Sequence, residues 1–281
     1  MKTPLSLTGL ALVAVLTCGA MAQDAENDAA PPATASKVHT PLTINDDTIG
    51  VLRMHQIGSI ILPGGKPPFP AVIVLHGCNG VSQNTRVWAR RLASWGYAAL
   101  IIDSFSSRGL QQVCDGSRAL PGPERAKDVF AAAAYLRSRS DIDGGRIGVL
   151  GYSHGGWTAL NASTKKSAAE AGVPPFRAIV ALYPFCPIKV APPLASDVQI
   201  FTGDADDWAK ASNCRTFVDK YAADAPHRPA LVVYPGARHS FDSNRPDRVY
   251  YDHRLAYDPK ATADAVERTR KFLDEHLRSE K

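Results

Sequence analysis

A serine between two glycines is the residue of this chain best placed for nucleophilic chemistry. The sequence Gly151-Tyr152-Ser153-His154-Gly155 follows the short apolar run 147–150, which is typical of a buried strand. Glycines two residues before and after a serine let the backbone turn sharply from a strand into a helix. Such a turn holds the hydroxyl exposed at the edge of a sheet, so the pattern predicts that Ser153 attacks a carbonyl carbon. The alternative is a glycine-rich turn that contains a serine by chance.

A serine hydroxyl becomes a good nucleophile only with a base and an acid beside it, and the chain contains both downstream. Asp206 follows a strand-like segment and a glycine turn, so its carboxylate can lie close to the sheet edge. Asp204 and Asp207 are the alternatives, but we expect Asp204 to stabilise the turn. We expect Asp207 to cap the helix predicted over residues 208–221. His239 follows the next strand and turn, and is the expected base.

A second glycine-containing loop could stabilise the negative charge that develops during acyl transfer. Residues 71–75 have the apolar pattern of a strand and lead into His76-Gly77-Cys78-Asn79-Gly80, where small residues let backbone amides approach a substrate. The expected oxyanion donors are the backbone N–H groups of Cys78 and of His154, the residue after the serine. The N–H group of Asn79 is the alternative to that of Cys78.

Apolar segments typical of strands alternate with segments of helical periodicity along the chain. We expect strands near residues 71–76, 97–103, 146–151, 177–183, 197–202 and 229–234, and helices near 84–95, 123–139, 155–163, 207–222 and 260–278. Such alternation predicts an α/β fold with a mostly parallel central sheet and helices on both faces. The length of residues 41–281 is ordinary for one α/β domain, and we expect no second domain.

Taken together, these motifs resemble those of the dienelactone hydrolase family. The resemblance rests on four segments, residues 76–80, 151–157, 203–208 and 234–242. It implies an α/β-hydrolase fold without a large lid domain, carboxylic-ester chemistry, and triad roles for Ser153, Asp206 and His239. The founding enzymes carry a cysteine nucleophile and a glutamate near the oxyanion strand, whereas this chain carries a serine and Cys78-Asn79. The resemblance therefore supports the reaction class better than the substrate.

The amino terminus has the pattern of a secretory signal peptide. Lys2 precedes the apolar stretch 5–16, and Ala20-Met21-Ala22 has the small-x-small pattern of a cleavage site. We expect residues 1–22 to be removed and residues 23–40, rich in Ala, Pro and Asp, to form a disordered leader. The apolar stretch is too short to span a bilayer as a retained helix. The sequence thus predicts a secreted or periplasmic protein without a stable membrane anchor.

Removal of the signal peptide takes Cys18 away and leaves four cysteines for an oxidising compartment. Four cysteines can pair in three ways. We expect the disulfides Cys78–Cys114 and Cys186–Cys214, because each would tie two loops together at the catalytic edge of the sheet. The cysteines are far apart in sequence and have no paired histidines, so a zinc site is not expected.

The net charge of the chain is small and positive. Its formal net charge is +5, and loss of Lys2 with the signal peptide leaves +4. Basic residues are interspersed with acidic ones, so the sequence does not favour nucleic-acid binding. We expect no cofactor and no metal ion.

Several side chains could contact the substrate. Arg108 could pair with a substrate carboxylate, with Arg238 as the alternative, although an exposed arginine more often makes a surface ion pair. Tyr152 and Trp208 could either line the pocket or belong to the core, and we expect Trp157 in the core.

Three functions are compatible with these residues. The first is a secreted hydrolase of small-molecule carboxylic esters or lactones that forms an acyl-enzyme on Ser153. The second is a serine peptidase of the same fold, since the same triad cleaves amides, but no propeller or acidic amino-terminus-binding motif is recognisable. The third is a binding protein on a hydrolase scaffold, which is disfavoured because every triad position is filled. We predict the first; the sequence does not determine the oligomeric state or the physiological substrate.

Overall fold

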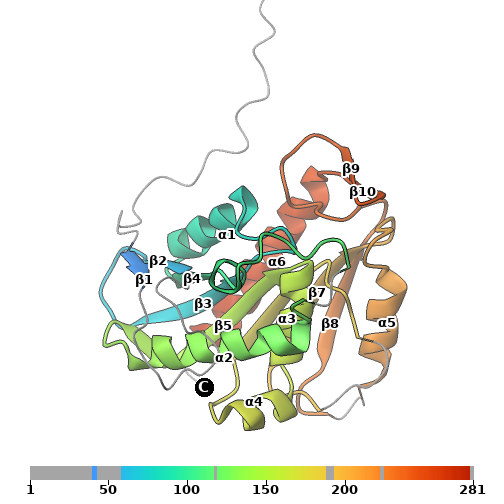
Figure 1. The fold of residues 1–281 in the computed structure, drawn as a ribbon. Coiled ribbons are helices and arrows are strands. Elements are labelled where there is room, and N and C mark those ends of the chain that lie inside the picture. Colours follow the sequence, from blue (N-terminus) through green and yellow to red (C-terminus); the bar gives the residue numbers. More distant parts are fainter. Residues whose placement is uncertain (1–39, 43–57, 117–118, 188–192, 222–224, 279–281) are drawn as a thin grey trace, which may run out of the picture.

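The computed structural model describes residues 40–42, 58–116, 119–187, 193–221 and 225–278 (Figure 1). The helices are α1 (Gln83–Ser94), α2 (Gly122–Ser138), α3 (His154–Ala162), α4 (Lys165–Ala171), α5 (Ala211–Asp219) and α6 (Pro259–Leu277), and Ser106–Arg108 form the short 3₁₀ helix η1. The strands are β1 (Thr40–Leu42), β2 (Gly58–Ile61), β3 (Phe69–Leu75), β4 (Ala98–Ile102), β5 (Ile142–Tyr152), β6 (Ala178–Leu182), β7 (Asp197–Gly203), β8 (Pro229–Tyr234), β9 (Arg248–Tyr250) and β10 (His253–Leu255).

The described strands β1 to β8 form an eight-stranded sheet in the order β1-β2-β4-β3-β5-β6-β7-β8. The strands from β4 to β8 are parallel to one another, and β2 and β1 add to the β4 edge in antiparallel orientation. Strands β9 and β10 form a separate antiparallel pair. Because parallel strands end at the same edge of a sheet, the loops after β3, β5, β7 and β8 come together there.

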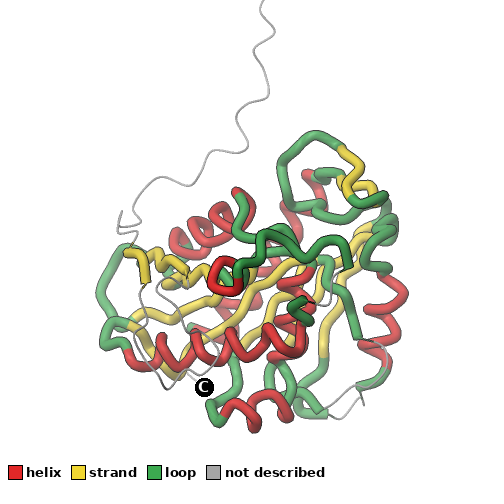
Figure 2. Tube along the Cα trace, viewed as in Figure 1, coloured by secondary structure: helices red, strands yellow, loops and turns green. Residues whose placement is uncertain are grey.

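Helices cover both faces of this sheet (Figure 2). Helices α1 and α6 pack on one face, and α2, α3, α4 and α5 pack on the other. Successive residues of β3 alternate between the two cores. Val72 and Val74 lie in the core beneath α1 and α6, whereas Ile73 and Leu75 lie in the core beneath α2 to α5. A fully buried parallel strand therefore needs an apolar residue at every position, which is the pattern of this segment.

The predicted α/β fold, with a mostly parallel sheet and helices on both faces, is confirmed. The helix expected to start at residue 207 begins instead at Ala211. The reason is local, because the Asp206 side chain accepts hydrogen bonds from the backbone N–H groups of Trp208 and Ala209 and holds them in a turn. The expected cap role of Asp207 is wrong, since Lys210 occupies that position.

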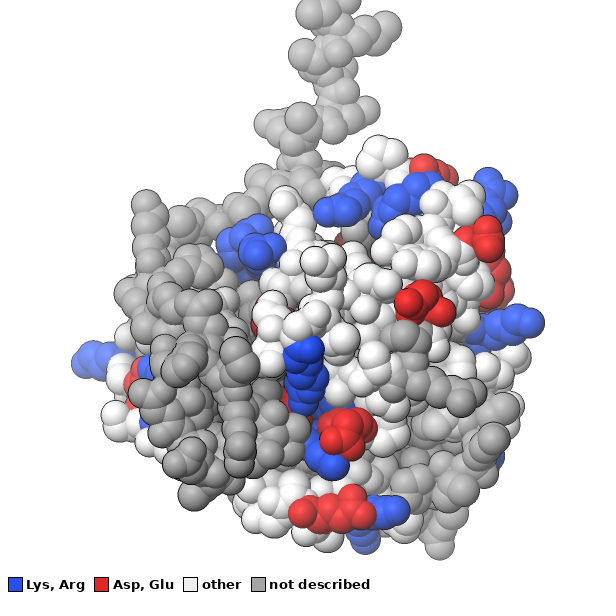
Figure 3. All heavy atoms as spheres, in the orientation of Figure 1, with Lys and Arg blue, Asp and Glu red and all other residues white. Residues whose placement is uncertain are grey.

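The structure contains the disulfides Cys78–Cys114 and Cys186–Cys214, with Cα atoms 4.9 and 5.0 Å apart. The expected signal peptide, residues 1–22, and nearly all of the expected leader lie outside the described residues, and Thr40 is the first residue of β1. None of the described helices is long and apolar enough to cross a membrane. On the face drawn in Figure 3, basic side chains are scattered among acidic ones.

Candidate active site

Ser153 lies at the sharp turn between β5 and α3. Its φ of 53° and ψ of −120° are a conformation that L residues rarely adopt. A Cβ atom on Gly151 would lie 2.3 Å from the carbonyl oxygen of Gly155, and one on Gly155 would lie 2.3 Å from that of Leu75. The Ser153 N–H donates to the carbonyl oxygen of Leu182, at the end of β6, at 2.9 Å. The turn therefore requires glycine at both positions around the serine.

The ring of His239 lies between Ser153 and Asp206. Its Nε2 is 2.9 Å from Ser153 Oγ, and its Nδ1 is 2.8 Å from Asp206 Oδ2. A carboxylate only accepts hydrogen bonds, so the Nδ1 proton faces Asp206 and the Nε2 lone pair faces the serine hydroxyl. The second Asp206 oxygen accepts the N–H groups of Trp208 and Ala209 at 2.9 and 2.8 Å. With His239 3% and Asp206 4% exposed, this arrangement is shielded from water.

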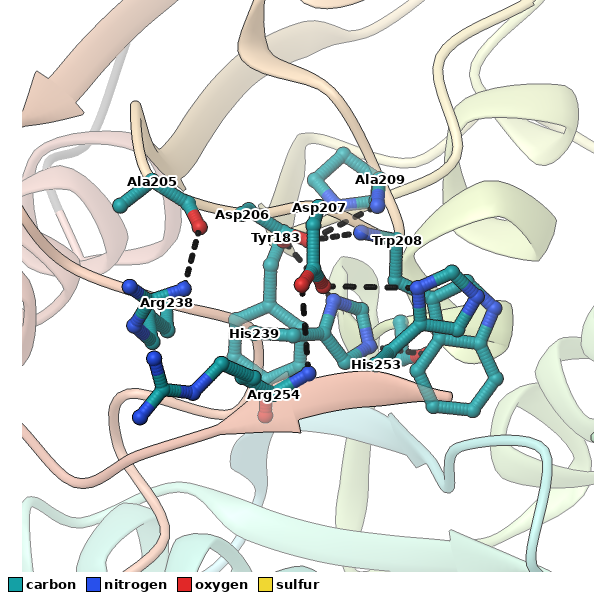
Figure 4. Close-up of polar contacts among 12 residues, drawn as sticks. Tyr183, Ala205, Asp206, Asp207, Trp208, Ala209, Arg238, His239, His253 and Arg254 are labelled. Atoms are coloured by element: carbon teal, nitrogen blue, oxygen red, sulfur yellow. Dashed lines mark hydrogen bonds and ion pairs between the residues drawn. The ribbon is translucent and has the colours of Figure 1, made fainter. Parts of the chain in front are cut away.

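The two neighbouring carboxylates make other contacts. Asp204 Oδ1 accepts the N–H of Gly236 at 2.6 Å, which joins the turns after β7 and β8 as expected. Asp207 lies 3.4 Å from His253 Nδ1 and accepts the N–H of Arg254 at 3.3 Å (Figure 4). Of the three carboxylates, Asp206 makes the hydrogen bond to His239.

A further buried carboxylate, Asp242, holds the loop that carries His239. It accepts hydrogen bonds from Trp88 Nε1 and the Tyr183 hydroxyl, both at 2.6 Å, and from Asn84 Nδ2 at 3.1 Å. Burial raises the pKa of Tyr183 well above its usual value, and the charge of Asp242 raises it further, so the hydroxyl stays a donor. The Tyr183 ring lies edge-on to His239, with centroids 4.8 Å apart. Sequence reasoning missed Asp242; the available signal was an acidic residue three positions after the expected base.

The two residues expected to supply backbone oxyanion donors, Cys78 and His154, border the cavity beside Ser153. Helix α3 begins at His154, so its N-terminal end, with its partial positive charge, lies at the serine. The loop of Cys78 is held by the disulfide to Cys114 and by a 2.8 Å hydrogen bond from the Val113 N–H to the Cys78 carbonyl oxygen.

A fully buried arginine connects the two segments that carry the expected donors. Arg125 Nη1 donates to the His76 carbonyl oxygen at 2.9 Å and to His154 Nδ1 at 3.0 Å, and its Nε donates to Ser104 Oγ at 3.0 Å. His154 Nε2 donates to the Leu120 carbonyl oxygen at 3.0 Å, which leaves Nδ1 as the acceptor. Burial and the charge of Arg125 lower the pKa of His154 to about 3. Sequence reasoning gave no signal for this buried cation.

Two pockets of different character open beside Ser153 and His239. The larger has a volume of about 480 Å³, and its walls include Val113, Pro121, Trp157, Tyr183, Phe185 and Trp208. The smaller has a volume of about 140 Å³, and its walls include Asn79, Tyr152, Ser240, Arg245, Arg248 and Tyr250. The larger is apolar and within the usual size range of small-molecule sites, roughly 300–1,000 Å³.

Arg108, which was expected to bind a substrate carboxylate, pairs with a carboxylate of the protein itself. Its guanidinium pairs with both oxygens of Asp128, at 2.9 and 2.7 Å, and donates to the Ser104 carbonyl oxygen. These contacts occupy the planar face that would otherwise bind a carboxylate. Arg238 directs Nη1 toward the Ala205 carbonyl oxygen at 3.4 Å (Figure 4).

The aromatic candidates differ in their surroundings. Trp208 lines both pockets, with its ring centroid 5.0 Å from that of His239 and stacked on His253. Tyr152 is buried and borders the smaller pocket, and its hydroxyl contacts Thr85. Trp157, which was expected in the core, lines the larger pocket instead.

Sequence reasoning missed two basic residues of the smaller pocket, Arg245 and Arg248. Burial lowers the pKa of Arg248, and the charge of Arg245 lowers it further, which indicates that the two guanidinium groups repel each other. Among the described residues, no group of three or more His, Cys, Asp or Glu side chains could hold a metal ion.

Residues 58–277, which are most of the chain, match the model of the dienelactone hydrolase family. The chain belongs to the dienelactone hydrolase family. The predicted resemblance is thereby confirmed, and membership makes the protein a carboxylic ester hydrolase.

Named relatives agree with this assignment. A protein from Methylorubrum extorquens called "Putative carboxymethylenebutenolidase" is 26% identical over 227 residues, 76% of this chain and 75% of the relative. A Bradyrhizobium protein called "Probable 2-oxo-3-(5-oxofuran-2-ylidene)propanoate lactonase" is 26% identical over 82% of this chain and 92% of its own length. The solved structure of a "Putative Dienelactone Hydrolase" from Klebsiella pneumoniae superposes with a TM-score of 0.65 at 21% identity, covering 85% of this chain and 98% of that one, and so supports the fold.

Proposed function

We propose that this dienelactone hydrolase family member is an exported serine hydrolase that cleaves carboxylic esters or lactones through an acyl-enzyme on Ser153. The observation that supports the proposal is the ring of His239, whose two nitrogens lie 2.9 Å from Ser153 Oγ and 2.8 Å from Asp206 Oδ2. Both distances are within the range for general-base catalysis, and a cavity adjoins the hydroxyl.

Acylation uses these three side chains in sequence. Ser153 Oγ attacks the carbonyl carbon while His239 Nε2 takes the hydroxyl proton, and the carbonyl electron pair moves onto oxygen. The tetrahedral intermediate collapses when that pair re-forms the carbonyl and the bond to the alkoxy oxygen breaks. His239 Nε2 then gives its proton to the departing oxygen. Asp206 stabilises the imidazolium and keeps the Nδ1 proton directed toward itself.

Deacylation reverses the proton path with water in place of the alcohol. Water attacks the acyl carbon and loses its proton to His239 Nε2, and collapse of the second intermediate returns that proton to Ser153 Oγ. The net reaction adds one water to an ester or lactone and releases an acid and an alcohol. For a lactone, both groups remain on one product molecule.

The negative charge of each intermediate lies at the N-terminal end of α3. The backbone N–H of His154 is one donor, and the N–H of Cys78 is the other, with Asn79 as the alternative to Cys78. The Arg125 guanidinium holds the carbonyl oxygen of His76 and the ring of His154, and so aligns the two donor segments with each other. Preorganised donors of this kind stabilise the transition state because they need not reorient during the reaction.

Export is supported by the signal-like amino terminus and by the two disulfides. Disulfides persist in oxidising compartments and are uncommon in the reducing cytosol. Cys78 and Cys114 border the larger pocket, and Cys186, in the loop after β6, is bonded to Cys214 of α5. We therefore propose a secreted or periplasmic location.

A direct test is the Ser153→Ala variant, with Ser94→Ala at the exposed end of α1 as a matched control. Ester hydrolysis by Ser153→Ala should fall by about 10⁴-fold or more, because no acyl-enzyme can form. A fluorophosphonate should label the wild type and the control at Ser153 but leave Ser153→Ala unlabelled. Labelling or hydrolysis that persists in Ser153→Ala contradicts the proposal. Faster turnover of aminoacyl amides than of esters would favour the peptidase function instead.

A further inference from the structure

The two pockets beside Ser153 differ in chemistry as well as in size. The larger one, of about 480 Å³, has no Lys, Arg, Asp or Glu among the described residues that line it. The smaller one, of about 140 Å³, is lined by two arginines and by polar side chains. An ester bound with its carbonyl carbon at Ser153 must place its acyl portion on one side and its alkoxy portion on the other. The side chains that line each pocket can therefore indicate which pocket holds the acyl portion and which holds the alkoxy portion.

The larger pocket has the walls of an aromatic site. Trp157 projects from α3, and its ring lies edge-on to that of Phe185, with centroids 5.7 Å apart. Phe185 is 52% exposed, which is a high exposure for a phenylalanine and indicates surface available for a ligand. The next residue, Cys186, is bonded to Cys214 of α5, which holds the Phe185 backbone in place. Trp208 lines the same pocket from the loop after β7.

The direction of proton transfer decides which portion enters which pocket. His239 Nε2 must deliver its proton to the departing alkoxy oxygen, so the alkoxy portion lies on the side of the histidine loop. His239 itself lines both pockets, but Ser240, Arg245 and Arg248 from the same segment line only the smaller one of the two. His154 and Trp157 of α3, which begins directly after Ser153, line the larger pocket. The acyl portion therefore lies over the start of α3.

We infer that the preferred substrates are esters whose acyl portion carries an apolar ring and whose alcohol portion is short and polar. This inference rests on the proposed function of Ser153. The ring lies against Trp157 and Phe185, where edge-on and offset contacts between aromatic groups add to the gain from burying apolar surface. The alcohol portion lies among the polar groups of the smaller pocket.

Three non-conjugated esters test the inference in the full, oxidised mature protein. Ethyl 3-phenylpropanoate has the ring on the acyl side, 3-phenylpropyl acetate has it on the alcohol side, and ethyl propanoate has none. The saturated spacer keeps the reactivity of the carbonyl similar. We expect kcat/KM for ethyl 3-phenylpropanoate to exceed that of each of the other two by about tenfold or more, as is usual for filling an apolar pocket.

Two variants test the walls. Phe185→Ala and Trp157→Ala should each lower the ratio of kcat/KM for ethyl 3-phenylpropanoate over ethyl propanoate by about fivefold, because the ring loses a partner. The control is Val249→Ala, a similarly exposed apolar residue (67%) outside the walls of both pockets, and it should keep the wild-type ratio. Because Phe185 is exposed, its variant should fold even if Trp157→Ala does not.

The outcomes are separable. Hydrolysis of ethyl propanoate at the same kcat/KM as ethyl 3-phenylpropanoate overturns the inference and leaves the proposed function standing. Preference for 3-phenylpropyl acetate, or an unchanged ratio in Phe185→Ala, also overturns the inference. Failure to hydrolyse all three esters, together with no fluorophosphonate labelling of Ser153, overturns the proposed function and this inference with it.

Discussion

Two histidines lie beside Ser153, and their surroundings make them chemically different. His239 has a carboxylate, Asp206, on one nitrogen and the serine hydroxyl on the other. His154 has a buried cation, Arg125, on one nitrogen and a backbone carbonyl on the other. Burial and that cation lower the pKa of His154 to about 3, so its ring is neutral and both nitrogens are used in structural contacts. A histidine beside a serine is therefore suited to act as a base only when the group on its other nitrogen stabilises the protonated ring.

The same division applies to the loops around these histidines. The proposed acid and base lie on the loops after β7 and β8, and the proposed oxyanion donors lie on the loop after β3 and at the start of α3; these are called the acid and base side and the oxyanion side. Each side lies next to a disulfide, with Cys78–Cys114 on the oxyanion side and Cys186–Cys214 between the loop after β6 and α5. Substitutions on the two sides should thus affect the reaction in different ways.

The largest contrast is expected between the two histidines. His239→Ala should lower kcat/KM for a short ester by about 10⁴-fold or more, because proton transfer is lost. His154→Gln should lower it by less than about tenfold, since only the side-chain contacts to Arg125 and the Leu120 carbonyl oxygen change while the backbone N–H of residue 154 remains. Steady-state kinetics on folded variants, checked by circular dichroism, measures both. Equal losses in the two variants would contradict the proposed division of roles.

A second contrast concerns the carboxylates beside His239. Asp206→Asn should lower kcat by about 10³–10⁴-fold, because the amide neither stabilises the imidazolium nor keeps the Nδ1 proton in place. Asp207→Asn is the matched control, and it changes a partly exposed contact with His253, which contributes little to stability. Its kcat should stay close to that of the wild type. A severe loss in Asp207→Asn with a mild one in Asp206→Asn would reverse the assignment of the acid.

Removal of the two disulfides should affect stability in both cases but catalysis in only one. The bridges join residues 36 and 28 positions apart, and on chain entropy each should stabilise the fold by about 3–4 kcal/mol. Paired Cys→Ala variants of either bridge should therefore unfold at lower temperature. The Cys78/Cys114 pair should also lower kcat several-fold at a temperature where it is folded, since it borders the serine. Similar kcat in both paired variants would show that this bridge stabilises the fold without positioning the oxyanion loop.

The smallest effect is expected in the dependence of stability on pH. The lowered pKa of His154 means that below about pH 6.5 the unfolded chain takes up a proton that the folded chain does not. The contribution of neutral His154 to the free energy of unfolding should therefore be complete above pH 6.5. It should decrease as the pH falls toward 3. Between pH 7 and pH 5, urea unfolding should show a loss about 2 kcal/mol larger for the wild type than for His154→Gln. Identical losses would contradict the neutral, arginine-bound state of His154.

Short-range sequence patterns predicted much of this molecule. The glycines around Ser153 were recognisable because the turn leaves no room for a Cβ atom, a constraint set by adjacent residues and the strand beside them. The alternation of apolar and helical segments predicted the parallel sheet because a buried strand needs apolar residues on both faces. Asp206 and His239 were recognisable as acid and base candidates because each follows a predicted strand, and parallel strands end at the same edge of a sheet.

The partners of long polar side chains were decided by the tertiary structure. Arg108 was expected at the substrate, but α2 brings Asp128 within reach of it. Both carboxylate oxygens of Asp128 accept hydrogen bonds from the Arg108 guanidinium. Arg245 and Arg248 line the smaller pocket instead, because the chain after His239 returns to the sheet edge there.

The sequence by itself determined the fold class, the strained serine turn and which residues could serve as base and acid, since these depend on local backbone geometry and periodicity. Only the tertiary structure decided that Arg125 links His76 with His154, that Asp242 anchors the histidine loop, and that Trp157 faces a pocket. These contacts join segments up to 158 positions apart. No local pattern records them, because burial and charge at such sites depend on every element packed around them.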